Sequence, residues 1–128
     1  MSEIEYAQIF QNWIDNANTS FSLFITILFA YLLAGHFVAK QLPRVAAFGM
    51  TLLVCLVLVG PLLSHLGSHW MIYQTTVQYN AQYPEGWVFP PGEPSLMGPL
   101  LFGILPALIS LVLSIYYVHF VARRVLTS

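Results

Sequence analysis

Charged residues are scarce in this sequence of 128 residues, and their scarcity limits the classes of protein to which it can belong. Only four Lys and Arg and five Asp and Glu occur, which is 7% of the chain, whereas 58% of the residues are hydrophobic. In soluble proteins about a quarter of the residues are charged. The composition therefore predicts a membrane protein, and a net charge of −1 argues against a nucleic-acid partner.

Cysteine pairs and the usual catalytic combinations are also missing. The single cysteine, Cys55, has no intrachain disulfide partner and is interpreted as a small hydrophobic residue. The sequence contains no Ser/His/Asp set and no glycine-rich phosphate loop, so it does not predict an enzyme. The acidic and polar N-terminal segment is unlike a cleavable signal peptide, so we expect the first apolar helix to direct membrane insertion.

Three long apolar stretches lie between the charged residues. About 20 apolar residues in a helix span the hydrocarbon core of a bilayer. We therefore expect transmembrane helices over residues 19–39, 45–73 and 98–122. A kink is expected at Gly60-Pro61, because proline removes a backbone donor. The length supports one domain, residues 1–128.

The segments outside these stretches predict two further elements. Residues 3–17 have an apolar and a polar face at 100° per residue, with Ser2 and Glu5 at the spacing of a capping box. Such an amphipathic helix lies in the membrane interface or packs on the protein itself. Residues 74–97, rich in proline and aromatic residues, predict one long irregular outer loop. The expected fold class is an all-α membrane protein with three transmembrane helices, an N-terminal amphipathic interfacial helix and this loop.

Basic and acidic residues are separated along the chain, and this separation predicts the orientation. The basic residues flank one set of helix ends: Lys40, Arg44, Arg123 and Arg124. The acidic residues all lie on the opposite side: Glu3, Glu5, Asp15, Glu85 and Glu93. Because short basic loops stay in the cytoplasm, we expect the N-terminus outside and the C-terminus in the cytoplasm. Short loops and this clear asymmetry favour a multi-pass protein of a bacterial inner membrane.

Small residues recur at four-residue spacing on all three expected transmembrane helices. In lipid, such rows allow helix backbones to approach closely. The helix-packing candidates are Ser22, Thr26, Ala30 and Ala34 on the first helix, Gly60, Ser64 and Ser68 on the second, and Gly103, Ala107 and Ser114 on the third. An alternative is that the hydroxyl groups line a polar path in an oligomeric channel, although such groups can also bond to their own helix.

The four histidines are the candidate ligands for a cofactor or metal. His36 and His119 are expected at matching depths near the inner interface, which is the arrangement of a bis-imidazole haem site. His65 and His69 are one turn apart near the outer interface, where two imidazoles on one helix face can ligate a metal ion. The alternative for each pair is hydrogen bonding near a helix end. No histidine or acidic residue is expected near the midplane, which argues against a proton pump.

The sequence thus favours a role in helix packing over catalysis or cofactor binding. The predicted function is a small polytopic membrane protein that serves as an interaction or accessory subunit of a homo-oligomer or a larger membrane complex, in contact with the lipid bilayer. The alternatives are a metal- or haem-binding subunit that uses the histidine pairs, and an oligomeric channel. The pattern does not specify which cofactor, if any, is bound.

Overall fold

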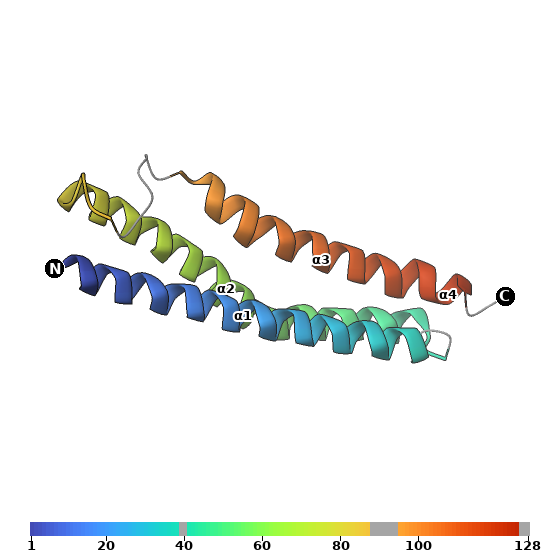
Figure 1. Cartoon of the computed structure of the whole chain (residues 1–128). Helices are drawn as coiled ribbons and strands as arrows, with labels where there is room; N and C mark the ends of the chain where they lie inside the picture. The colour runs from blue at the N-terminus through green and yellow to red at the C-terminus, as the bar shows by residue number, and fades with distance from the viewer. Residues whose placement is uncertain (39–40, 88–94, 126–128) are drawn as a thin grey trace.

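A computed structural model of the chain describes residues 1–38, 41–87 and 95–125, all of whose long elements are helices. The elements are α1 (Glu3–Val38), α2 (Arg44–Gln82) and a third helix of four consecutive segments: η1 (Pro99–Ile104), α3 (Leu105–Tyr116), η2 (Tyr117–Val121) and α4 (Ala122–Val125). Figure 1 shows α1 and α2 as a long hairpin with the third helix along it. All three helices are long and apolar enough to cross a membrane. The prediction of an all-helical chain with three such helices is confirmed.

α1 joins two helices that the sequence analysis predicted separately, at residues 3–17 and 19–39. It begins with the expected capping box, in which the Ser2 amide donates to Glu5 Oε2 at 2.6 Å and the Glu5 amide to Ser2 Oγ at 3.3 Å. The helix contains no proline, and its only glycine is Gly35. Nothing in the backbone therefore interrupts it near residue 18, which corrects the predicted break.

The apolar face of the N-terminal part of α1 packs on α2. Tyr6 and Ala17 are buried, and Phe10 packs against the Tyr6 cluster. The Tyr6 ring meets Tyr79 of α2 edge to face, with the ring centroids 5.5 Å apart, and the Tyr6 hydroxyl donates to Gln82 Oε1 at 2.9 Å. Contact with α2 thus accounts for the amphipathic pattern of residues 3–17.

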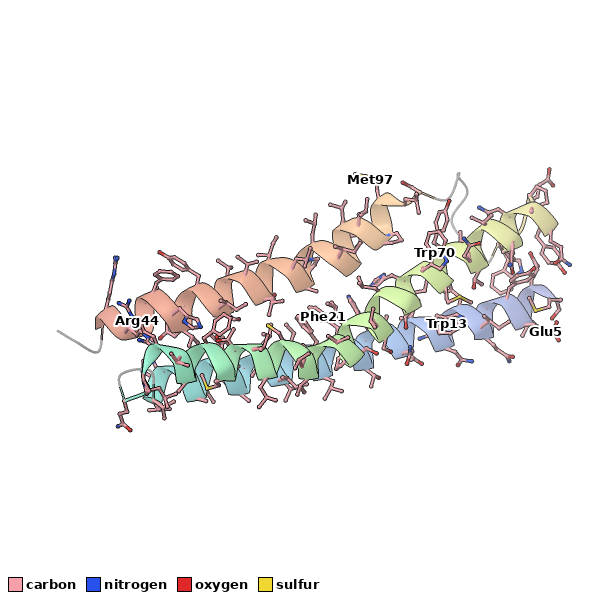
Figure 2. All side chains as sticks on the ribbon, turned by 180° about the vertical axis from the view of Figure 1, so that it is seen from behind. Glu5, Trp13, Phe21, Arg44, Trp70 and Met97 are labelled. Atoms are coloured by element: carbon pink, nitrogen blue, oxygen red, sulfur yellow. The ribbon has the colours of Figure 1, made fainter. Side chains whose placement is uncertain are left out.

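α2 runs past residue 73, the predicted end of the second transmembrane helix, to Gln82. Residues 74–82 contain neither glycine nor proline, and the helix stops just before Pro84, which cannot continue it. The predicted loop over residues 74–97 therefore begins only after Gln82. Residues 88–94 of this predicted loop lie outside the described part of the chain. Figures 1 and 2 show α2 changing direction near its middle, where Pro61 lies within the helix.

The third helix contains two π-helical segments. In η1 the Leu105 amide bonds to the carbonyl of Leu100, five residues back. Pro106 follows directly, and its ring excludes the normal bond to the carbonyl four residues back, so the turn widens. In η2 the Ala122 amide bonds to the Tyr117 carbonyl in the same way. These wide turns determine which side chains of the third helix face α1 and α2.

The core lies where the three helices meet. Phe24 and Leu28 of α1, Leu58 of α2 and Ala107 of α3 form one buried cluster. Closer to the C-terminal end of α1, Gly35 touches the third helix so closely that an added Cβ would lie 2.5 Å from Val118 Cγ2. Small residues thus hold the third helix against the hairpin at two levels.

Candidate functional site

The most connected polar group of the described structure is the Thr51 hydroxyl, which joins all three helices near the end of α1, the start of α2 and the end of the third helix. Thr51 Oγ1 lies 3.0 Å from the carbonyl oxygen of Ala47, 2.8 Å from the Tyr31 hydroxyl and 2.7 Å from His119 Nε2. Tyr31 and Thr51 are both buried. One residue from each helix therefore meets at a single oxygen in an otherwise apolar region.

The geometry of this network determines the direction of each bond. A carbonyl oxygen only accepts, so the single hydroxyl hydrogen of Thr51 is donated to Ala47. The two lone pairs of Thr51 then accept from the Tyr31 hydroxyl and from His119 Nε2–H. The hydroxyl is fully satisfied. His119 consequently carries its hydrogen on Nε2, and this nitrogen is not a metal ligand in the observed arrangement.

His36 belongs to a different contact at the same end. Its Nδ1 lies 2.8 Å from the Tyr117 hydroxyl, and the two rings stack with centroids 6.2 Å apart. Tyr117, Val118 and His119 are consecutive, yet all three contact α1 or α2, which the wide turn of η2 allows. His36 and His119 thus bond to separate hydroxyls through different ring nitrogens, Nδ1 in His36 and Nε2 in His119. Haem ligation through Nε2 of both rings would require His119, but not His36, to release its present partner.

His65 and His69 lie together at the centre of the molecule. His65 is buried, and its Nδ1–H donates to the carbonyl of Ala17 at 3.1 Å. Its Nε2 has no hydrogen-bond partner among the described residues. The His69 ring meets it edge to face at 4.6 Å between centroids and packs on Gly103, where an added Cβ would be 3.1 Å from His69 Cδ2.

The two rings alone do not make a metal centre. Within residues 1–38, 41–87 and 95–125, no group of three or more His, Cys, Asp or Glu side chains has the arrangement of a metal site. Metal ligation by His65 and His69 would need further ligands in addition to these two imidazoles. The His65 imidazole contacts α1, and the His69 imidazole contacts the third helix.

Polar contacts continue along the α1–α2 interface on the outer side of His65. Ser20 and Ser64 hydroxyls lie 2.8 Å apart, and the Asn16 amide donates to Ser68 Oγ. Ser68 in turn donates to the Ser64 carbonyl at 2.8 Å. Ser20 and Ser68 are buried, and the bonds to Ser64 and Asn16 satisfy their hydroxyls between the helices.

The predicted small-residue rows occupy different environments. On the third helix, Gly103, Ala107 and Ser114 are buried. On α2, Ser68 is buried, while Gly60 and Ser64 are exposed, the latter bonded to Ser20. On α1, all four residues of the row are exposed: Ser22, Thr26, Ala30 and Ala34.

The hydroxyls of these rows bond largely to their own helices. Thr26 Oγ1 donates to the Ser22 carbonyl at 2.8 Å, and Ser114 Oγ donates to the Ser110 carbonyl at 2.7 Å. Ser110 does the same with Pro106 at 2.6 Å. A hydroxyl bonded in this way has donated its only hydrogen within its own helix, and its oxygen can still accept a further bond.

Several residues of the network did not emerge from the sequence analysis. Tyr31, Thr51 and Tyr117 form the contacts of the inner end, and Gly35 makes the closest helix approach. The available signal was the presence of tyrosine and threonine well inside apolar stretches, where a hydroxyl requires a partner. No significant match was found when the chain was compared with protein-family models, with curated proteins and with solved structures.

Proposed function

We propose that this chain is a multi-pass subunit of a membrane assembly, and that the exposed row of small residues on α1 packs against a transmembrane helix of another subunit. One observation carries the proposal. The four predicted packing residues of α1 are all exposed, whereas α2 and the third helix contact the opposite side through Phe24, Leu28 and Tyr31. This row of small residues is suited to close helix packing, and no described helix of this chain covers it.

The position of the row on α1 supports this role. At 100° per residue, Ser22, Thr26, Ala30 and Ala34 lie on one side of the helix, away from the buried residues. In lipid, apolar bulk gives no driving force for association, and helices associate where small side chains let backbones approach and increase dispersion contact. A lipid-facing helix without a partner needs no such row. The partner is either a second copy of this chain or another protein of the complex.

The proposal includes a position in the bilayer. Arg44 and Trp70 of α2 are 26 positions apart in the sequence, which corresponds to about 39 Å along a helix. A bilayer with its headgroup regions is about 40–45 Å thick. Trp13 of α1 borders the same surface hollow as Trp70, so the two tryptophans are suited to one interface and Arg44 to the other. The tips of α1 and α2 beyond the tryptophans then extend into water.

The proposed orientation follows from the charge asymmetry, with the basic end of the helices in the cytoplasm of a bacterial cell. We predict that a cysteine placed at Ser2 or Ser95 reacts with an impermeant thiol reagent in intact cells, in a Cys55→Ser background. A cysteine at Gln41, in the basic turn, should react only after the membrane is permeabilised. Labelling of Gln41→Cys in intact cells, with Ser2→Cys protected, would show the opposite orientation.

The packing surface is tested by enlarging one of its residues. We predict that Ala30→Leu lowers the affinity of assembly by about fivefold to about 150-fold, because overpacking at a close crossing costs about 1–3 kcal/mol. Ala46→Leu, at an exposed alanine near the start of α2, is the matched control and should leave the assembled mass unchanged. The measurement is the mass of the complex in mild detergent, together with cross-linking of Thr26→Cys in membranes.

A third variant separates assembly from folding. Ala107 is only 1% exposed, so Ala107→Leu should lower the stability of the single chain, whereas Ala30→Leu should not. The proposed assembly through α1 does not exist if Ala30→Leu and Ala46→Leu both have the mass of a monomer, like the unchanged protein, and Thr26→Cys forms no cross-link. The mass of the cross-linked product identifies the partner as a second copy or another protein.

A further inference from the structure

A basic hollow lies between the beginning of α2 and the end of the third helix. It has a volume of about 640 Å³, within the range of ligand sites. Its lining residues are Arg44, Phe48, His119, Phe120, Arg123 and Arg124. Figure 2 shows Arg44 at this end of the molecule, beside the end of the third helix. Three guanidinium groups from two helices thus border one hollow.

The electrostatic surroundings of this hollow favour an anion. No Asp or Glu occurs between Asp15 and Glu85 or after Glu93, so no acidic side chain comes from the neighbouring sequence. α2 begins at Arg44, and the third helix ends beside it with α4, so the opposite helix dipoles offset each other and the guanidinium groups supply the positive charge. Guanidinium groups match the oxygen atoms of phosphate in charge and in geometry. The chemistry of the hollow therefore fits a phosphate group.

Two aromatic side chains give the hollow an apolar border. Phe48 is 65% exposed and Phe120 is 54% exposed, and the Phe120 ring stacks on Tyr116 with centroids 5.3 Å apart. Both lie on the lipid side of the arginines, one turn further into their helices. A soluble anion needs no such surface, whereas a phospholipid presents a phosphate and acyl chains together. The combination of basic and apolar lining distinguishes these two kinds of ligand.

The internal polar contacts position one wall of the hollow. His119 is held by its bond to Thr51, and that hydroxyl is in turn held by Tyr31 and Ala47. Arg123 Nη2 lies 3.5 Å from the Leu42 carbonyl, which connects the end of the third helix to the turn before α2. The hollow is therefore part of the folded interface between α2 and the third helix.

We infer that this hollow binds the headgroup of an anionic phospholipid, with its phosphate against Arg44, Arg123 and Arg124 and its acyl chains along Phe48 and Phe120. The inference depends on the proposed position of the basic end at the inner membrane surface, but not on the assembly through α1. Basic sites between transmembrane helices on the cytoplasmic side are suited to such lipids.

The test uses the whole chain in a neutral detergent, with the retained lipids counted by native mass spectrometry. Phosphatidylglycerol and phosphatidylcholine are titrated separately, and we expect one phosphatidylglycerol per chain to be retained at concentrations at which phosphatidylcholine is not. The double variant Arg44→Gln/Gln41→Arg moves one charge along the basic turn and preserves the charge bias that sets orientation. It should weaken phosphatidylglycerol binding about fivefold or more.

A second variant and a soluble competitor complete the test. Arg124→Gln, at an exposed position, should weaken phosphatidylglycerol binding to a similar degree and leave the unfolding temperature unchanged without lipid. Glycerol 1-phosphate and inorganic phosphate should not displace the lipid. Equal retention of both lipids, unchanged binding by both variants, or displacement of the lipid by inorganic phosphate at equal concentration would overturn the inference. The same spectra report the oligomer mass, so failure here is distinguishable from failure of the assembly proposal.

Discussion

Gly35→Val is expected to destabilise the protein by about 1–3 kcal/mol or more, because it inserts a side chain into the closest approach between α1 and the third helix. A Cβ at Gly35 would lie 2.5 Å from Val118 Cγ2 and 2.8 Å from Val118 Cγ1, distances at which one backbone must move. Val118 is itself only 1% exposed, so its side chain has no free space into which it can turn. The measurement is reversible unfolding in mixed micelles.

Gly49→Val provides the matched control for the Gly35 prediction. Gly49 is also a helical glycine, but an added Cβ there meets nothing within 4 Å, so the substitution should be nearly neutral. A second comparison uses Gly35→Ala alone and with Val118→Ala, which removes both methyl groups that the new Cβ would meet. The pair should show a coupling energy of about 0.5–3 kcal/mol in a double-mutant cycle. Equal effects at Gly35 and Gly49, or no coupling with Val118, would mean that this approach is not close.

The broad fold could be predicted because it depends on composition and on local signals. Three apolar stretches separated by charges indicate three long helices, and the Ser2 and Glu5 spacing predicted the start of α1 correctly. The ends of the helices were less predictable. Near residue 18 a change from polar to apolar composition suggested two helices, yet composition alone does not interrupt a backbone that lacks proline and glycine.

The C-terminal end of α2 is a second helix end that the sequence did not predict correctly. The prolines and aromatic residues of the segment 74–97 suggested a loop that begins at residue 74, but Thr75 and Tyr79 are buried in α2. Tyr79 packs on Tyr6 and donates to Glu3 Oε1 at 2.7 Å, and Gly86 fits over its ring because any side chain there would clash. The contacts of Tyr79 with Tyr6 and Glu3 join residues more than 70 positions apart. A helix stabilised by such distant contacts cannot be delimited from its own residues.

The candidate site was predictable in its residue types but not in its pairings. The histidines were selected because ionisable groups are costly in an apolar medium, and the structure places all four in contacts between helices. Their expected partners were each other, within the pairs His36–His119 and His65–His69. Only the second pair is in contact, because the partner of a buried imidazole depends on helix rotation, which small residues such as Gly35 and Gly103 determine through close packing.

Thr51→Val is expected to lower the free energy of unfolding by about 2 kcal/mol, the second large effect that the structure predicts. Valine has nearly the shape of threonine, so the substitution changes hydrogen bonding without creating a cavity. It removes the only acceptor that the structure gives to the Tyr31 hydroxyl and to His119 Nε2–H. Hydrogen bonds between transmembrane helices average about 0.6 kcal/mol and reach about 1.7 kcal/mol, so loss of two such bonds at a buried site accounts for the expected value.

The control for this substitution is Thr26→Val on α1. Thr26 Oγ1 bonds only to the Ser22 carbonyl of its own helix and is exposed, so its replacement should change stability by less than about 0.5 kcal/mol. Tyr31→Phe in the Thr51→Val background removes one of the unpaired donors, and it should cost less there than in the native chain, because a buried donor without an acceptor is itself destabilising. If Tyr31→Phe costs the same in both backgrounds, the Tyr31 and Thr51 hydroxyls do not interact. The junction would then depend on the bond between Thr51 and His119 and on the packing of Gly35 against Val118.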